Sequence, residues 1–491
     1  MSKCVVRPAM FCIALAALPL RLPAQSDVAF PPEVYAARRA RLVEAVAGAP
    51  VIIPGRYMIR SGGQSKQDPN FWYLTGVESP YAILVISGDE GGRKREVLFL
   101  PRRYQFAGAQ YPMAEPRFRG AAWNQPIRRL GPGRDAELAT GIAETYPVDE
   151  FAERLPEIVG DARTVYFASE GGRLYAPPGL GEPLSYRQQL EEAVTKLLSD
   201  REWKNPTPFI ELMRLIKDRY EIAALRRAAA ISVQGLVEAM RAIRPGSNDL
   251  EIAGLMEYVW KREGSPRSSF GPIVSSGSAA VSLYTLKSEN YNSPNRVMQD
   301  GELVFIDYGA AEYQMYTSDI CRTFPVSGRF TDEQREYYEI VLEAQKAALA
   351  RIEPGVMMID VIRAAAQVFK DHGLEQFENI DRMGEDRVWG ILPSPTYWLA
   401  QGGTLTDYSG ASGTGVRDLG HHIGLEALDS RDYAQPLVAG MVFTVEPKLY
   451  IPAKGIAIMI EDMILVTQDG YENLSAGAPR EVGEIEMIMG R

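Results

Sequence analysis

Four acidic residues lie inside or at the ends of apolar segments, where a charged side chain is costly. Asp307 ends LVFID, Asp319 lies in TSDICRTFP, Glu446 follows VFTV and Glu461 interrupts AIMIEDMILV. Their surroundings, rich in Val, Ile, Phe and Met, are typical of buried strands. A buried carboxylate must be paired or must bind a metal ion. His421, in LGHHIGLE, adds an imidazole to this set.

These carboxylates need positive charge nearby if the fold brings them together. Arg322 is the only basic residue that we assign to the strands in question. Two divalent cations would balance four carboxylates, and a pair of metal ions is an arrangement that hydrolases use. The residues therefore predict a two-metal hydrolytic site.

The composition predicts a soluble globular protein with two large domains. The chain has 491 residues, of which 46% are hydrophobic, and this length exceeds that of one typical domain. The formal net charge of −10 provides no attraction for the phosphates of nucleic acid. We therefore expect no nucleic-acid partner.

Residues 1–24 are predicted to be a secretory signal peptide. Lys3 and Arg7 precede the apolar run FCIALAALPL, and small residues near Ala24 favour cleavage there. The run is about half of the ~20 residues that a membrane span needs, so we expect no stable span. The mature protein would then be secreted or periplasmic, and retention of the N-terminus as an anchor is the alternative. Cys321 would be its only cysteine, which excludes an intrachain disulfide.

The apolar pattern divides the chain into an α/β half and an α+β half. In the first half, strands at 82–87 and 96–100 alternate with helical stretches such as 31–48, which is typical of an α/β domain. The stretch 199–208, with two prolines, is predicted to be a linker. The predicted domains are 25–205 and 206–491.

In the second half we expect helices that cover a largely antiparallel sheet. One long helix spans 222–243 and stops at Pro245-Gly246. A second runs from 247 or 248 to about 263. A third begins with the capping box at Thr331 and ends before Pro354, and a fourth continues to about 371.

Eight stretches, in the same order, resemble a known family. They are QDPNFWYLTGVESP (67–80), LMRLIKDRYEIAALRRAAAIS (212–232), FGPIVSSG (270–277), GELVFIDYGAAEY (301–313), SDICRTFPVSGRF (318–330), GHHIGLE (420–426), TVEPKLYIP (444–452) and IEDMILVT (460–467). The family is that of the Xaa-Pro aminopeptidases (aminopeptidase P), which belong to the pita-bread superfamily with prolidase, creatinase and methionine aminopeptidase. The resemblance implies a creatinase-like α/β N-terminal domain followed by an α+β pita-bread catalytic domain.

The resemblance also implies that the five residues of the set are metal ligands. Asp307 would hold one metal, Asp319 and Glu461 would bridge the pair, and His421 and Glu446 would complete the second position. Oxygen-dominated ligation with one imidazole favours Mn and tolerates Co, Fe or Zn. The metals would activate a water molecule and polarise the scissile carbonyl. Glu446 would be the catalytic proton shuttle to the leaving nitrogen of proline.

Three positions depart from the family pattern. The family usually has His where this chain has Leu283 and Leu428, and Arg where it has Met459. The two missing His normally contact the substrate or the transition state. We therefore expect metal binding to be retained and peptide hydrolysis to be slow. Tyr284 and His422 are the candidates for substrate binding.

The prediction is an exported dinuclear-metal aminopeptidase that releases the N-terminal residue from peptides with proline in second position. By resemblance it would be a homo-oligomer. One alternative is a prolidase-like dipeptidase, or another C–N hydrolase on the same site. The other is a non-catalytic, metal-bearing protein that binds a peptide or a partner. The long segment 378–418 would be a lid over the site, or else a structural insertion or a subunit contact.

Overall fold

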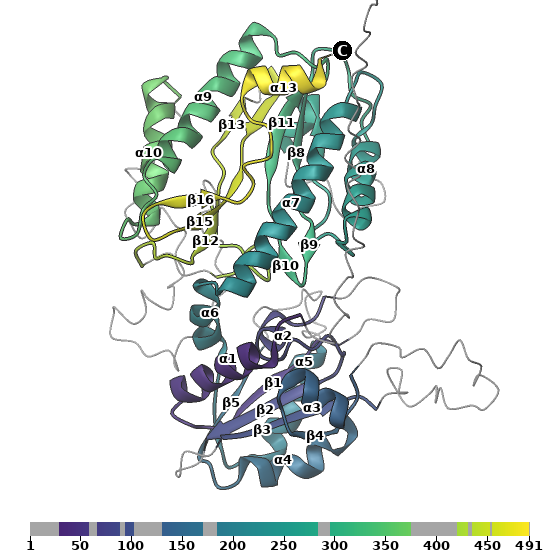
Figure 1. Cartoon of the computed structure of the whole chain (residues 1–491), viewed down its shortest axis with the longest axis vertical. Helices are drawn as coiled ribbons and strands as arrows, with labels where there is room; N and C mark the ends of the chain where they lie inside the picture. Colours follow the sequence, from purple (N-terminus) through teal and green to yellow (C-terminus); the bar gives the residue numbers. More distant parts are fainter. Residues whose placement is uncertain are drawn as a thin grey trace, which may run out of the picture.

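A computed structural model describes residues 29–57, 66–88, 94–102, 130–169, 184–282, 295–374, 420–430, 435–451 and 454–490. The predicted signal peptide, Leu283, Tyr284 and the long segment 378–418 lie outside these ranges. The described residues form two lobes, with the N-terminal lobe in purple and blue and the C-terminal lobe in teal to yellow (Figure 1). Within the described residues, no helix is long and apolar enough to cross a membrane.

The N-terminal lobe is built on a mixed six-stranded sheet. From edge to edge its strands are β4 (Glu144–Pro147), β3 (Lys94–Leu100), β2 (Ile83–Gly88), β1 (Val51–Pro54), β5 (Thr164–Phe167) and β6 (Glu202–Lys204). Its described helices are α1 (Pro32–Ala45), α2 (Pro69–Thr75), α3 (Arg134–Thr140), α4 (Phe151–Val159) and α5 (Tyr186–Leu197), with a 3-10 turn, η2 (Val148–Glu150). Strand β1 pairs antiparallel with β2 and parallel with β5.

Helices cover both faces of this sheet, which explains why its central strand is apolar throughout. Every residue of β1 is buried, and successive residues of a strand point to opposite faces. Val51 and Ile53 pack in the cluster that includes residues of α1, whereas Ile52 packs in the cluster that includes residues of α4. The prediction of an α/β domain is confirmed for this half.

The stretch 199–208 is more than a linker. Strand β6 pairs in parallel with β5, and Trp203 packs against the same cluster as α4. The short linking helix α6 (Thr207–Leu215) then begins with Pro208 in its first turn, where the missing N–H of proline costs nothing. Pro208 therefore marks the start of α6. Strand β6, at the edge of the sheet, forms because β5 pairs with it.

The helices of the C-terminal lobe follow the predicted pattern. The described ones are α7 (Arg219–Ala242), α8 (Asp249–Arg262), α9 (Asp332–Leu349), α10 (Met358–Asp371) and α13 (Val482–Met489). Asp218, Asn248 and Thr331 close capping boxes at the starts of α7, α8 and α9. These side chains satisfy backbone N–H groups that a helix start leaves without partners.

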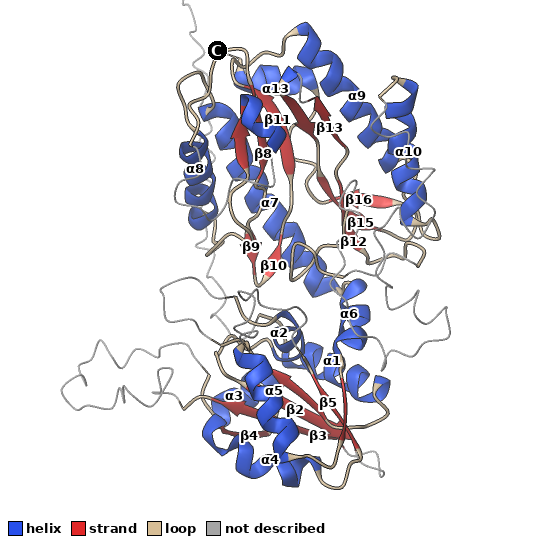
Figure 2. Ribbon diagram, turned by 180° about the vertical axis from the view of Figure 1, so that it is seen from behind, coloured by secondary structure: helices blue, strands red, loops and turns tan. Residues whose placement is uncertain are grey.

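Short antiparallel sheets lie between two pairs of these helices. One sheet has the order β11 (Cys321–Pro325), β8 (Leu303–Asp307), β7 (Val274–Ser276), and another has β12 (Val442–Val445), β15 (Asp462–Val466), β16 (Tyr471–Asn473). The remaining described strands form two hairpins, β9 (Glu312–Tyr313) with β10 (Tyr316–Thr317) and β13 (Lys448–Ile451) with β14 (Ile456–Met459). Helices α7 and α8 lie on one side of the strands and α9 and α10 on the other (Figures 1 and 2). The prediction of an α+β half is confirmed.

Candidate metal centre

The first two acids meet because β8 and β11 are antiparallel neighbours. Asp307, at the end of β8, lies opposite Cys321, at the start of β11, and Asp319 precedes Cys321 by two residues. The end of one strand and the start of the next share an edge in such a pair. The backbones close here because the N–H of Gly309 donates to the carbonyl of Ile320 at 2.9 Å, and any side chain at Gly309 would collide with Ile320.

The two glutamates come together in the same way from β12 and β15. Val445 is paired with Asp462, so Glu446 and Glu461, the adjoining residues, lie at one edge. The N–H of Glu461 donates to the carbonyl of Cys321 at 3.0 Å. This bond joins the sheet of the glutamates to the sheet of the aspartates.

His421 is held against this edge by Thr444. The N–H of His421 donates to Oγ1 of Thr444 at 3.1 Å, and that hydroxyl donates to Oε1 of Glu446 at 3.3 Å. On the imidazole, Nδ1 lies 3.3 Å from the carbonyl oxygen of His422. When Nδ1 donates its proton there, Nε2 is left as the atom with a free lone pair, which is how metal-binding histidines are commonly oriented. Nε2 faces the carboxylates.

The five predicted residues form one buried cluster. Asp319, His421 and Glu461 each offer a donor atom, and these atoms all lie within 4.8 Å of one another. Nε2 of His421 is 3.5 Å from Oδ2 of Asp319 and 3.6 Å from Oε1 of Glu446. Asp307, the most exposed of the five, is only 8% exposed. The structure therefore brings together every residue of the predicted set.

The electrostatics of the cluster fit divalent metal ions. Burial raises the pKa of Asp319 well above its usual value, and the charges of Asp307 and Glu446 raise it further. Burial also raises the pKa of Glu461 well above its usual value, with Asp319 as the next cause. Carboxylates that repel one another away from water require a positive charge to stay ionised. Among the described residues, Oε2 of Glu461 has no hydrogen-bond partner, so it is available as a ligand.

Lys448 is a cation at the centre that the sequence prediction left out. Its Nζ is 3.5 Å from Oε2 of Glu446, and the residue is only 7% exposed. Arg322, in contrast, pairs with Asp462. The expectation that Arg322 is the only basic residue of these strands is therefore wrong. Glu446 and Lys448 lie on either side of Pro447, between the end of β12 and the start of β13, so the alternation of a strand did not indicate this contact.

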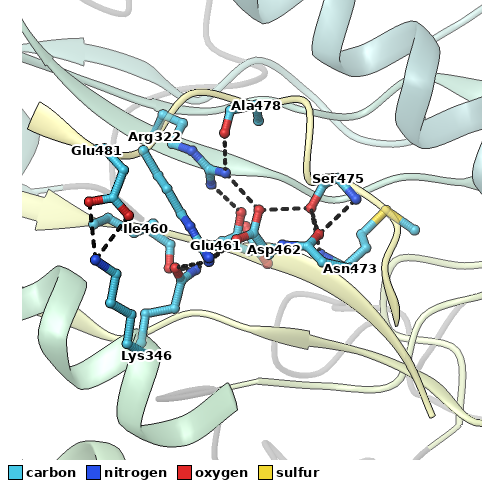
Figure 3. A network of polar contacts seen from close by, with 12 residues as sticks. Arg322, Lys346, Ile460, Glu461, Asp462, Asn473, Ser475, Ala478 and Glu481 are labelled. Carbon is cyan, nitrogen blue, oxygen red and sulfur yellow. Dashed lines mark hydrogen bonds and ion pairs between the residues drawn. The ribbon is translucent and has the colours of Figure 1, made fainter. Parts of the chain in front are cut away.

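A buried polar network around Arg322 and Asp462 lies next to Glu461 of the cluster (Figure 3). The guanidinium of Arg322 pairs with Asp462 and uses its other donors on backbone carbonyls. These carbonyls belong to Cys321, Glu461, Ala478 and Pro479. Ser475 donates to Asp462 from the other side at 2.8 Å. One side chain thus links the segments that carry Asp319 and Glu461, the two predicted bridging ligands.

The other sequence candidates lie around the cluster. His422 is 2% exposed and packs edge-on against Phe443, with ring centroids 6.3 Å apart. Its role in substrate binding stays a prediction. Leu428 is 37% exposed, on the same loop as His421. Met459 lies directly opposite Lys448 in the β13–β14 pair and packs with apolar side chains.

The loop of His421 is also tied to the linking helix and to the N-terminal lobe. On this loop, Asp429 forms ion pairs with Arg214 and, at 2.9 Å, with Lys217. Arg214 donates as well to Asn70 of α2 at 2.8 Å. Burial alone would raise the pKa of Asp429, but Arg214 and Lys217 outweigh it and hold this pKa well below its usual range.

Comparison with known proteins adds two family matches. The model of metallopeptidase family M24 matches residues 223–468. The model of the aminopeptidase P N-terminal domain matches residues 35–166. The first match contains all five residues of the cluster. The expected order of a creatinase-like α/β domain and an α+β pita-bread domain is confirmed.

Individual relatives match over most of their length. The chain is 32% identical over 440 residues to the Xaa-Pro aminopeptidase of Haemophilus influenzae, covering 86% of this chain and 88% of that protein. It is 31% identical over 470 residues to the Escherichia coli Xaa-Pro aminopeptidase, covering 92% and 96%. Zinc-substituted E. coli aminopeptidase P in complex with product superimposes with a TM-score of 0.72 at 27% identity, covering 94% and 98%.

Proposed function

The chain belongs to metallopeptidase family M24, among its Xaa-Pro aminopeptidases, and we propose that it is an exported enzyme with two divalent metal ions that releases the N-terminal residue from peptides with proline in second position. The substrate class follows from the names of relatives that match it along most of their length. The metal requirement follows from the cluster itself.

One observation carries the proposal. Three donor atoms, from Asp319, His421 and Glu461, lie within 4.8 Å of one another in a buried position. Glu446 lies next to His421, and Asp307 is close enough to raise the pKa of Asp319. We propose that these five residues hold the metals in the roles given by the family resemblance. The donor set is mostly oxygen with one imidazole, which favours Mn and tolerates Co, Fe or Zn.

Bound divalent ions would lower the pKa of water at the centre and polarise the scissile carbonyl. The side chains would do the rest. Glu446 is the buried carboxylate whose Oε1 accepts from Thr444 and whose Oε2 lies 3.5 Å from Nζ of Lys448. It would take a proton from the attacking water and pass it to the leaving nitrogen of proline. His421, oriented through the carbonyl of His422, would present Nε2 as a ligand.

The location and assembly of the enzyme are proposals of the same kind. Export rests on Lys3 and Arg7 followed by the short apolar run of the N-terminus. N-terminal sequencing of protein recovered from the periplasm or medium tests it, with a start near residue 25 expected. A homo-oligomer is expected from the family resemblance, and light scattering on the purified protein tests that.

The activity is tested with the tripeptide Ala-Pro-Ala and the manganese-loaded protein, with release of alanine followed by chromatography. We expect slow but measurable release by the wild type, because Leu428 and Leu283 stand where the family has imidazoles. Glu446→Gln should abolish it, since an amide cannot accept the proton. Ala-Ala-Ala is the control substrate and should be cleaved less.

Two results would redirect the assignment. Cleavage of the dipeptide Ala-Pro with none of Ala-Pro-Ala would favour the prolidase-like alternative. A fully metallated wild type that binds Ala-Pro-Ala, yet releases no more alanine than Glu446→Gln, would support the non-catalytic binding protein instead.

A further inference from the structure

Lys448 is a buried cation at the edge of the metal centre to which none of the family roles applies. It opens β13, two residues after Glu446, and its Nζ lies 3.5 Å from Oε2 of that carboxylate. Its side chain is 8% exposed. Burying an ammonium group is costly unless a partner compensates it. The position of Lys448 therefore needs an account in terms of the carboxylates that surround it.

Lys217 is a second buried lysine, and it differs from Lys448 in the partners of its ammonium group. Nζ of Lys217 lies 2.9 Å from Asp429 and 2.7 Å from the carbonyl of Arg214. These contacts tie the loop of His421 to the linking helix α6, and Asp429 is not one of the five residues of the cluster. Lys448 instead neutralises a carboxylate of the metal cluster. Across the β13–β14 pair it faces Met459, an apolar side chain that offers no charge.

Lys448 lies beside the carboxylate that the imidazole of His421 also approaches. Nε2 of His421 is 3.6 Å from Oε1 of Glu446, and Nζ of Lys448 is 3.5 Å from Oε2 of the same carboxylate. A metal ion held by His421 and Glu446 would therefore have an ammonium group next to one of its own ligands, and two positive charges at such a position repel each other.

We propose that Lys448 is a built-in counter-cation of the metal centre, which weakens metal binding at the position formed by His421 and Glu446, so that the two metal positions fill one after the other with separate affinities. This inference rests on the two-metal centre of the proposed function. Even with the dielectric constant of water, the repulsion between an ammonium group and a divalent ion ~5 Å away corresponds to on the order of tenfold in affinity.

Net charge gives the direction of the effect, and position shows where it is largest. Four carboxylates, those of Asp307, Asp319, Glu446 and Glu461, match two divalent ions without any help. With Lys448 present, the first ion would meet three net negative charges and the second ion one, whereas without Lys448 they would meet four and two. Lys448 therefore weakens both steps, and because its Nζ lies beside Glu446, it weakens the position formed by His421 and Glu446 more.

The test is a calorimetric titration of metal-free protein with Mn²⁺ at low ionic strength. We compare the wild type with Lys448→Met, which keeps length and removes charge, and with Lys448→Arg, which keeps charge. Lys454→Met is a matched control, because Lys454 belongs to the same hairpin region but pairs with Glu333 at the surface. Thermal unfolding of each metal-free variant checks folding, and Lys448→Gln replaces the methionine variant if that does not fold.

We expect two separate steps in the wild type, in Lys448→Arg and in Lys454→Met. In Lys448→Met the weaker step should tighten by roughly tenfold or more, and the tighter step should change less. One ion in the wild type and two in Lys448→Met at the same metal concentration would also support the proposal. Equal weak steps in the wild type and Lys448→Met, or a weaker one in the variant, overturn it. If no variant binds Mn²⁺, the two-metal centre itself is wrong.

Discussion

Nη2 of Arg322 lies 2.6 Å from Oδ1 of Asp462, and neither side chain is exposed to solvent. Asp462 directly follows Glu461, and Arg322 follows Asp319 by three residues. This ion pair therefore couples the two predicted bridging ligands through the backbone. Arg322 also donates to the backbone carbonyl of Glu461, so this ion pair helps to fix the positions of the two predicted bridging ligands.

Replacing Arg322 with Met should destabilise the metal-free protein strongly. The change leaves Arg480, 3.1 Å from Oδ2 of Asp462, as the remaining cation beside this buried carboxylate, and breaking a buried pair costs up to about 3–5 kcal/mol. The free energy of unfolding in urea measures it. The control is Arg226→Met, whose ion pair with Glu472 is at the surface and should cost less than about 1 kcal/mol. Similar losses in the two variants would contradict a special role for the buried pair.

The metal content should depend on Asp319. Protein purified without chelator, or reconstituted with Mn²⁺, is expected to carry close to two divalent ions per chain by elemental analysis. Asp319→Asn should lose at least one ion, because a neutral amide replaces a bridging carboxylate. Asp469→Asn, at an exposed position, makes the same chemical change and should leave the content intact. No metal in the reconstituted wild type would rule out the centre.

The ion pairs of Asp429 should make part of the stability sensitive to acid. Its pKa is held well below the usual range in the folded protein, whereas the unfolded value is about 3.9. The contribution of Asp429 is therefore complete above about pH 4 to 5 and is lost as the pH falls toward the folded pKa. The difference in unfolding free energy between wild type and Asp429→Asn should shrink between pH 6 and pH 3. A difference independent of pH would show that the carboxylate charge is not involved.

Restoring two imidazoles should raise peptidase activity. Leu428 lies on the loop of His421, and Leu283 is outside the described residues. Losing one hydrogen-bond donor to a developing oxyanion costs on the order of 10²–10³ in rate, and two such groups need not act independently. We expect the double variant Leu283→His with Leu428→His to raise kcat/KM for Ala-Pro-Ala by roughly tenfold or more. Leu250→His, on the exposed face of α8, is the control. An unchanged rate would mean that the pocket no longer accepts imidazoles.

Local signals predicted the helices well. The capping box at Thr331 and the start at Asn248 were predicted from residues three apart, whereas the box at Asp218, just before α7, was missed and the helix was expected to begin at 222. The strand β6 was missed for a different reason. Its three residues lie beside two prolines, and only pairing with β5 makes them a strand.

At the candidate site, too, contacts between distant segments could not be predicted from local patterns. The sequence identified five residues of suitable type, and the structure brings all five together. It did not show how they meet, because the bond between Glu461 and Cys321 joins strands that are far apart in the chain. Lys448 was missed because its significance depends on the distance to Glu446. A pattern of residue types contains no such distance.

Arg214 has a consequence for protein engineering. It holds Asn70 of one lobe and Asp429 of the other with a single guanidinium, so the loop of His421 is shaped partly by the N-terminal lobe. The two lobes are therefore not interchangeable modules. A chimera that takes its first lobe from a relative would have to inherit α6, with Arg214 and its partners on both sides, as one cassette.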